Sequence, residues 1–354
     1  MDKKYWSSRI QDLVPYTPGE QPKDRVFIKL NTNENPYPPS PKVLQAIQDN
    51  LDQRLRLYPD PEACELSAAL AEFYHIRPEQ VFCGNGSDEV LGLCFYAFFS
   101  PGKKVVFPDI TYSFYPVYTE LFGLDYEEIP LAEDFSLPVE RYLGGNGGVV
   151  ICNPNAPTGK TQPVEAIRAI LEANPDVVVL VDEAYADFGA QSVVPLIDEY
   201  PNLVVVGTMS KSRSLAGMRI GYAMGSPELI AAVKCVKNSF NSYPLDRLAL
   251  AAGKAAVEDV EYFEKTCSMV IATRERISAR LREMGFVVLD SNTNFILVTY
   301  PGRSGKEITQ GLRDRGVLVR RFDKERIYEY LRISIGTDEE MDTMCAALEE
   351  ILKG

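Results

Sequence analysis

The feature that most constrains the fold of this chain is a series of short apolar runs separated by segments of helical character. Continuous apolar runs occupy residues 148–152, 177–181, 203–206 and 220–224. Short runs that are apolar throughout are typical of strands buried on both faces. Because helical segments alternate with them, the pattern predicts an α/β fold whose central sheet is mostly parallel and flanked by helices. Functional residues are then expected at the carboxyl ends of the strands.

The pattern changes after about residue 245. A long charged amphipathic stretch, roughly 248–284, predicts one or two helices, and short strands alternate with helices beyond it. A chain of 354 residues exceeds the size that one core usually serves, so a large domain and a smaller α+β domain are expected. We predict four units. Residues 1–40 form an N-terminal segment contributing to the small domain and to an interface, and residues 41–245 form the large domain. Residues 246–285 form a connecting helical region, and residues 286–354 form the small C-terminal domain.

Charge and composition argue against several classes of protein. A formal net charge of −13 argues against nucleic acid or an anionic membrane surface as a partner. The first residues lack an apolar core of signal-peptide length, and no run of about 18 apolar residues predicts a membrane span. The seven cysteines are scattered, which indicates reduced thiols in a cytoplasmic protein. The single histidine, His75, argues against a His-rich metal site and against a Ser-His-Asp hydrolase.

Two strand ends carry polar residues that suit one cofactor. Lys211 follows the run 203–206, and Asp182 ends the run 177–181. An amine held at a strand end, with a lowered pKa, can form a Schiff base with an aldehyde and shuttle a proton beside it. A buried carboxylate needs a partner, and a pyridinium N–H is such a partner. The pair predicts a pyridoxal-phosphate site, against the alternatives of a solvated lysine and a helix-capping aspartate.

A phosphate cup is predicted beside this lysine. Ser87 and Asp88 open a helix after a glycine-containing turn, and free backbone N–H groups at such a position suit an anion. Ordinary helix capping is the alternative, because serine and aspartate are common caps. Ser210 and Arg219 flank Lys211, and the arginine would add charge-assisted hydrogen bonds to the phosphate.

Aromatic and basic residues extend the predicted pocket. Tyr185 is placed to donate to the cofactor's phenolate oxygen and Tyr112 to stack on its ring, with core packing as the alternative for Tyr185. Arg320, Arg321 and Arg332 end or interrupt apolar strands, which predicts a substrate carrying a carboxylate or a phosphate. A salt bridge within the chain is the competing interpretation for the adjacent arginines.

Seven motifs follow one another along the chain. They stand at 31–36, 58–60, 84–89, 153–159, 182–185, 210–211 and 331–337, and include Asn-Pro-Asn-Ala-Pro-Thr-Gly and Ser-Lys. In type and order they resemble the fold-type I, class II aminotransferases. The resemblance implies pyridoxal phosphate as cofactor, a large domain with a mostly parallel sheet, a smaller α+β domain, and a homodimer with active sites at the subunit interface.

Within that family the resemblance is strongest to members that act on histidinol phosphate. It implies transamination between histidinol phosphate and 2-oxoglutarate, giving imidazole-acetol phosphate and glutamate in histidine biosynthesis. Two enzymatic alternatives stay open: an aromatic amino acid aminotransferase acting on phenylalanine or tyrosine, and a related phospho-amino-acid decarboxylase. A cofactor-binding regulator is disfavoured, because such proteins usually carry a DNA-binding helical domain and this chain is acidic.

The resemblance also implies roles for single residues. Lys211 would be the Schiff-base lysine, Asp182 the partner of the pyridine nitrogen, and Tyr185 the phenolate donor. Further implied cofactor contacts are Ser87, Asp88, Tyr112, Asn155, Ser210, Arg219 and, on the neighbouring subunit's cofactor, Tyr58. Implied substrate contacts are Tyr16, Asn33, Arg320 and Arg332. Ala156 departs from the family pattern, which has an asparagine just before Pro-Thr-Gly; Asn155 stands one residue earlier.

Overall fold

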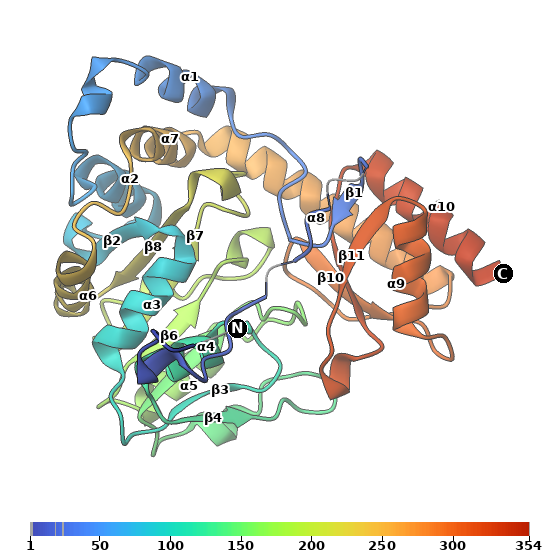
Figure 1. The fold of residues 1–354 in the computed structure, drawn as a ribbon, viewed down its shortest axis with the longest axis horizontal. Coiled ribbons are helices and arrows are strands. Elements are labelled where there is room, and N and C mark those ends of the chain that lie inside the picture. Colours follow the sequence, from blue (N-terminus) through green and yellow to red (C-terminus); the bar gives the residue numbers. More distant parts are fainter. Residues whose placement is uncertain (1–2, 18, 23–24, 354) are drawn as a thin grey trace.

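The computed structural model describes residues 3–17, 19–22 and 25–353 (Figure 1). Residues 1–2, 18 and 23–24 of the predicted segment 1–40 lie outside the described residues, as does residue 354. The described strands form two sheets, one of seven strands and one of five. Figure 1 shows the seven-stranded sheet in the larger part of the molecule and the five-stranded sheet in the smaller part.

The larger sheet has the strand order β2-β8-β7-β6-β5-β3-β4. Its strands are β2 Val81–Asn85, β3 Val105–Pro108, β4 Tyr126–Ile129, β5 Gly148–Cys152, β6 Val179–Asp182, β7 Leu203–Thr208 and β8 Ile220–Gly225. Four of its pairings are parallel, and β8 runs antiparallel to both of its neighbours. The prediction of a mostly parallel sheet is confirmed.

The helices follow and connect these strands. They are α1 Pro41–Asp49, α2 Cys64–Tyr74, α3 Gly86–Phe98, α4 Tyr115–Phe122, α5 Val164–Ala173, α6 Pro227–Phe240, α7 Arg247–Glu258, α8 Val260–Glu283, α9 Gly305–Asp314 and α10 Asp338–Lys353. The predicted amphipathic stretch 248–284 is therefore two helices, α7 and α8, which meet at Asp259. No helix of the described ranges is long and apolar enough to cross a membrane.

Helices cover both faces of the seven-stranded sheet. Val204 and Val206 of β7 belong to a hydrophobic cluster shared with α3, α4 and α6. Leu203 and Val205 belong to a second cluster shared with α2, α5 and α7. Because successive side chains of a strand point to opposite faces, a strand between two clusters must be apolar at every position. This packing explains the continuous apolar runs in the sequence.

The five-stranded sheet combines the start and the end of the chain. Its strands are β1 Ile28–Leu30, β9 Val287–Val288, β10 Phe295–Thr299, β11 Val317–Arg321 and β12 Leu331–Ser334. β1 pairs in parallel with β11, and the other pairings are antiparallel. The N-terminal segment thus contributes a strand to the smaller sheet, and α8 extends from the larger part of the molecule toward it (Figure 1). The four segment boundaries stay predictions.

Candidate active site

A cavity of about 320 Å³ is lined by residues of both sheets. Cys152, Asp182 and Thr208, at the carboxyl ends of β5, β6 and β7, line one side of it. Arg320 of β11 and Arg332 of β12 line it from the smaller sheet. This is the edge at which an α/β sheet collects functional side chains.

Lys211 follows β7 and is half-buried in the cavity wall. Its Nζ donates to the backbone oxygen of Thr32 at 3.3 Å. Burial, together with the positive charge of Arg332, lowers the pKa of Lys211 to about 8. An amine with this pKa is substantially neutral under mildly alkaline conditions, so it is available as a nucleophile and as a base.

Asn35 holds the backbone around this lysine. Its amide Nδ2 donates to the carbonyl oxygen of Lys211 at 3.0 Å and to that of Ser212 at 3.3 Å. Asn35 lies within the motif 31–36 and was not predicted as a site residue. The signal was weak, because the contact joins two segments more than 170 residues apart.

Asp182 is the last residue of β6 and is buried. Its carboxylate accepts hydrogen bonds from the Tyr115 hydroxyl at 2.9 Å and from the Ala184 N–H at 3.1 Å. Burial raises the pKa of Asp182 to about 6. Tyr115 of α4 was not predicted as a functional residue, and its position inside a helix gives no sequence signal.

Tyr185 lies in a buried hydrogen-bond chain between the two sheets. Its hydroxyl oxygen accepts from Asn33 Nδ2 at 3.0 Å, and Asn33 Oδ1 accepts from the Ser334 hydroxyl at 2.9 Å. The Tyr185 ring meets Phe295 edge-on at 5.0 Å. Burial raises the pKa of Tyr185 to about 12, so the phenol keeps its proton and remains a hydrogen-bond donor.

The predicted phosphate end lies at the start of α3. Arg219 Nη2 is 3.2 Å from Asp88 Oδ2, and the Tyr112 hydroxyl donates to Asp88 Oδ1 at 2.7 Å. Gly86 has a φ of +78°, and a Cβ there would lie 2.5 Å from Arg219 Nη2. The absence of a side chain at Gly86 therefore leaves room for the arginine beside the free N–H groups of the helix N-terminus.

Two further predicted phosphate contacts, Ser87 and Ser210, also line the cavity. The Ser210 hydroxyl accepts from the Thr208 hydroxyl at 3.0 Å. Thr208 itself lines the cavity and was not predicted. A hydroxyl at the end of an apolar strand was the sequence signal that could have identified Thr208.

The predicted substrate contacts Tyr16, Asn33, Arg320 and Arg332 all line the cavity. Arg332 donates to the Asn31 carbonyl at 3.0 Å, and its guanidinium lies over the Phe295 and Phe322 rings at 5.3 and 5.4 Å. The Nε of Arg332 is buried and has no hydrogen-bond partner among the described residues. A buried guanidinium with an unused donor indicates an anion-binding position.

The structure does not bring Tyr58 and Asn155 into the cavity. Tyr58 is 80% exposed and stacks on Tyr243 at 4.6 Å, so its implied role toward a second subunit stays a prediction. Asn155 donates to Ile110 and Thr158, both at 2.9 Å, and accepts from the Thr111 hydroxyl at 2.8 Å. These bonds occupy its amide, and the cavity lining includes Ala156 and not Asn155. The assignment of Asn155 as a cofactor contact therefore finds no support in the geometry.

The remaining residues fit pyridoxal phosphate. Lys211 supplies an amine, Asp182 a buried carboxylate and Tyr185 a protonated phenol at one cavity. Arg219 and the α3 N-terminus supply positive charge and N–H groups for a phosphate. The unpartnered Nε of Arg332 leaves a second anion position on the side of the smaller sheet.

Comparison with known proteins agrees with this chemistry. Residues 25–348 match the family model for class I and II aminotransferases, and the chain belongs to this pyridoxal-phosphate-dependent family. Its similar relatives include two histidinol-phosphate aminotransferases. That of Clostridium beijerinckii is 51% identical over 349 residues, which cover 99% of this chain and 98% of the relative. That of Clostridium acetobutylicum is 54% identical over 349 residues, with 99% of each chain covered.

A solved structure shares the fold. The histidinol-phosphate aminotransferase of Sinorhizobium meliloti, in complex with pyridoxal 5′-phosphate, superposes with a TM-score of 0.85 at 27% identity. The superposition covers 93% of this chain and 92% of that one. The fold assigned from the sequence, a fold-type I aminotransferase fold, is confirmed by this likeness and by the family match.

Proposed function

We propose that this chain transfers an amino group from histidinol phosphate to 2-oxoglutarate, giving imidazole-acetol phosphate and glutamate, as a step of histidine biosynthesis. The relatives that are 51% and 54% identical along their whole length support this substrate. The structural observation that carries the proposal is Arg332, which lines the same cavity as Lys211 and whose buried Nε has no partner in the part of the chain that the structure describes.

Each residue around the cofactor has a distinct task. Bound pyridoxal phosphate supplies an aldehyde carbon and a ring that withdraws electrons from the substrate's α-carbon. Lys211 would hold the cofactor covalently, and its amine would move a proton at the α-carbon of the substrate. Asp182 keeps a proton on the ring nitrogen, because a buried carboxylate favours a cationic partner. Tyr185 donates a hydrogen bond to the phenolate oxygen.

The substrate side must accept two different anions in turn. The phosphate of histidinol phosphate lies on the carbon that corresponds to the α-carboxylate carbon of glutamate. Arg332 suits both anions because its guanidinium donors form a planar fork. Arg320, also in the wall, adds positive charge. The Tyr16 and Phe322 rings line the same cavity and offer apolar surface for an imidazole.

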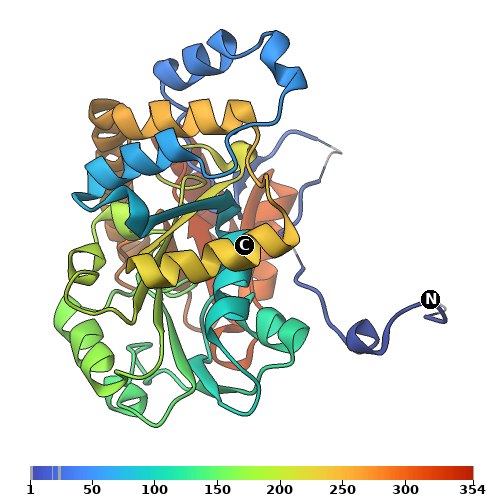
Figure 2. The same ribbon diagram turned by 90° about the vertical axis from the view of Figure 1, so that its left-hand side faces the viewer.

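We further propose a homodimer in the cytoplasm with the domain division given above. Leu55, Tyr58 and Phe240 are exposed, and an exposed apolar surface of this kind favours a second copy as partner. Figure 2 shows the beginning of the described chain, in dark blue, projecting from the rest of the molecule, where it would reach a neighbouring subunit.

The free cysteines, including the buried Cys83 and Cys94, support a reducing compartment. Strands β2–β8 all lie within 41–245, which supports that division.

A half-reaction tests the substrate. Protein loaded with pyridoxal phosphate is mixed with histidinol phosphate, histidinol, phenylalanine or tyrosine without a keto acid, and the visible absorbance of the cofactor is followed. We expect histidinol phosphate to remove that absorbance at the lowest concentration, and 2-oxoglutarate to restore it. A preference for phenylalanine or tyrosine would favour an aromatic aminotransferase instead, and release of carbon dioxide would favour a decarboxylase.

The variant Arg332→Met gives the matching structural test. It should raise KM for histidinol phosphate and for 2-oxoglutarate together, each by at least about 100-fold, because one charge-assisted contact serves both. An unchanged KM for either substrate would contradict the shared anion position.

A further inference from the structure

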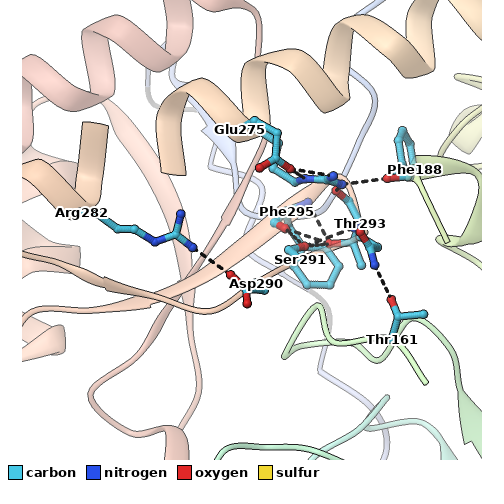
Figure 3. A network of polar contacts seen from close by, with 10 residues as sticks. Thr161, Phe188, Glu275, Arg282, Asp290, Ser291, Thr293 and Phe295 are labelled. Atoms are coloured by element: carbon cyan, nitrogen blue, oxygen red, sulfur yellow. Dashed lines mark hydrogen bonds and ion pairs between the residues drawn. The ribbon is translucent and has the colours of Figure 1, made fainter. Parts of the chain in front are cut away.

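Arg274 of α8 is a buried arginine outside the cavity, with a side chain only 4% exposed. Its Nη1 donates to the carbonyl oxygen of Phe188 at 2.8 Å and to that of Thr293 at 2.9 Å. Its one charged partner is the carboxylate of Glu275 at 2.9 Å, which is mostly exposed. Figure 3 shows this network, with Phe188, Thr293 and Glu275 gathered beside α8. A guanidinium is costly to bury, so its placement between two neutral carbonyls calls for an explanation.

The two carbonyls belong to two segments that both contact Tyr185. Phe188 ends the short helical turn Ala186–Phe188, and its N–H donates to the Tyr185 carbonyl at 3.2 Å. Thr293 belongs to the second segment and precedes Asn294 and Phe295, the first residue of β10. One guanidinium therefore ties the turn that follows Tyr185 to the start of β10.

The two residues that follow Thr293 both lead back to the Tyr185 side chain. The Phe295 ring packs edge-on against the Tyr185 ring at 5.0 Å. Asn294 Nδ2 donates to the Asn33 carbonyl at 2.9 Å, and Asn33 in turn donates to the Tyr185 hydroxyl at 3.0 Å. The position of the Tyr185 hydroxyl thus depends on main chain that Arg274 holds from both sides.

We propose that Arg274 is a positioning residue for the Tyr185 hydroxyl: it holds the turn after Tyr185 and the start of β10 together, so that the hydroxyl meets the phenolate oxygen of bound pyridoxal phosphate. The inference rests on the proposed cofactor chemistry and adds a residue that touches neither cofactor nor substrate. Because a hydroxyl that donates to an oxyanion favours the more negative protonation state, a well-placed Tyr185 lowers the pKa of the cofactor bound to Lys211. Losing that placement raises this pKa.

The experiment titrates the visible absorbance of the cofactor-loaded protein against pH. The variants are Arg274→Met, Arg274→Lys and Tyr185→Phe. Arg282→Met is the matched control, because Arg282 lies further along the same helix and pairs at 3.0 Å with the fully exposed carboxylate of Asp290 (Figure 3). We expect Tyr185→Phe to raise the titration midpoint most, Arg274→Met to raise it less, and Arg282→Met to leave it at the wild-type value.

Two further measurements separate loss of folding from loss of positioning: one on Arg274→Lys, and one on a double variant with Tyr185→Phe. If Arg274→Met does not fold, Arg274→Lys keeps the charge with fewer donors and should raise the midpoint by a smaller amount. In the Tyr185→Phe background the same Arg274 substitution should add no further shift, because the hydroxyl that it positions is gone. An equal shift in both backgrounds, or a wild-type midpoint in a folded Arg274 variant, would overturn the inference.

The same titration distinguishes this inference from the proposed function. Wild-type protein that captures no pyridoxal phosphate would overturn both. Wild-type protein that captures it and reacts with histidinol phosphate, but whose midpoint is indifferent to Arg274, would overturn only the positioning role.

Discussion

The hydroxyl of Tyr115 donates a hydrogen bond of 2.9 Å to the carboxylate of Asp182, at the floor of the cavity. Asp182 is 3% exposed, and its other hydrogen-bond donor is the backbone N–H of Ala184. Neither donor carries a charge, so burial outweighs both bonds and raises the pKa of the carboxyl to about 6. The carboxylate is therefore unfavourable without a cationic partner, and a protonated pyridine nitrogen supplies one.

This relationship predicts opposite effects of Asp182→Asn on stability and on activity. Between about pH 4 and pH 6 the folded state keeps a proton on Asp182 that the unfolded chain has released, so wild-type stability falls as the pH rises through this window. Above it the variant should be more stable than the wild type by about 3 kcal/mol without cofactor, and below pH 4 the difference should vanish. Denaturant unfolding of the cofactor-free proteins at several pH values measures this.

The same variant should lose at least about 100-fold in turnover, because the ring nitrogen lacks its anionic partner. Equal stability of both proteins at every pH would contradict the raised pKa, and wild-type turnover in the variant would contradict the role of the carboxylate.

The lowered pKa of Lys211 predicts how cofactor capture depends on pH. Only the neutral amine attacks an aldehyde, so the rate at which cofactor-free protein captures pyridoxal phosphate should rise with pH and level off above about 8. Arg332→Met should move the midpoint upward, because the positive charge of Arg332 is one cause of the lowered pKa. Stopped-flow absorbance measures the rate, and borohydride trapping with peptide mass analysis identifies the lysine.

Lys211→Ala should capture no cofactor covalently, whereas Lys254→Ala should behave as the wild type. Lys254 is a suitable control because it forms a surface ion pair with Glu65 at 2.8 Å, away from the cavity. Trapping on another lysine, or a wild-type midpoint near that of a free lysine, would refute the assignment.

Asn35 is predicted to act through the backbone of Lys211. Asn35→Ala removes both donors from the Lys211 and Ser212 carbonyls, and Asn35→Asp places a carboxylate against them. We expect kcat to fall about 10-fold for alanine and further for aspartate, with smaller changes in KM, because the proton-transferring amine is misplaced. Asn50→Ala, which removes a local bond to the Ala46 carbonyl, is the control. Wild-type kcat in Asn35→Asp would sink this role.

Gly86 is predicted to be essential for phosphate binding. Gly86→Ala introduces a Cβ 2.5 Å from Arg219 Nη2 at a φ of +78°, so we expect the Kd for pyridoxal phosphate to rise about 10-fold or more. Gly102→Ala has a similar φ of +84° but meets no atom within 4 Å, so it carries the backbone strain alone. Cofactor titration followed by absorbance compares them, and equal Kd values would show that the contact with Arg219 does not matter.

The sequence predicted much of the larger sheet because burial on two faces leaves a strong signal. The run 148–152 coincides with β5, and 203–206 falls within β7. The antiparallel direction of β8 left no such signal, because an apolar strand buried on both faces has the same composition in either direction.

The sequence likewise predicted some residues of the candidate site and missed others. Lys211 and Asp182 were recognisable because each follows an apolar run, where burying a charged side chain is costly unless it has a partner. Tyr115, Asn35 and Arg274 were missed, because their importance lies in contacts with segments distant in the sequence. Asn155 was assigned from its place in a motif, whereas in the structure its amide bonds to Ile110 and Thr158 and it is not among the residues that line the cavity.

By itself, then, the sequence determined which residues end the strands of the larger sheet and hence which groups can react, because the apolar periodicity of buried strands is a local property. Only the tertiary structure decided how those groups are tuned. The pKa of Lys211 near 8 depends on Arg332 from the smaller sheet, and the pKa of Asp182 near 6 on burial beneath α4. Electrostatic shifts and buried hydrogen bonds depend on distances between residues far apart in the chain, and folding alone sets those distances.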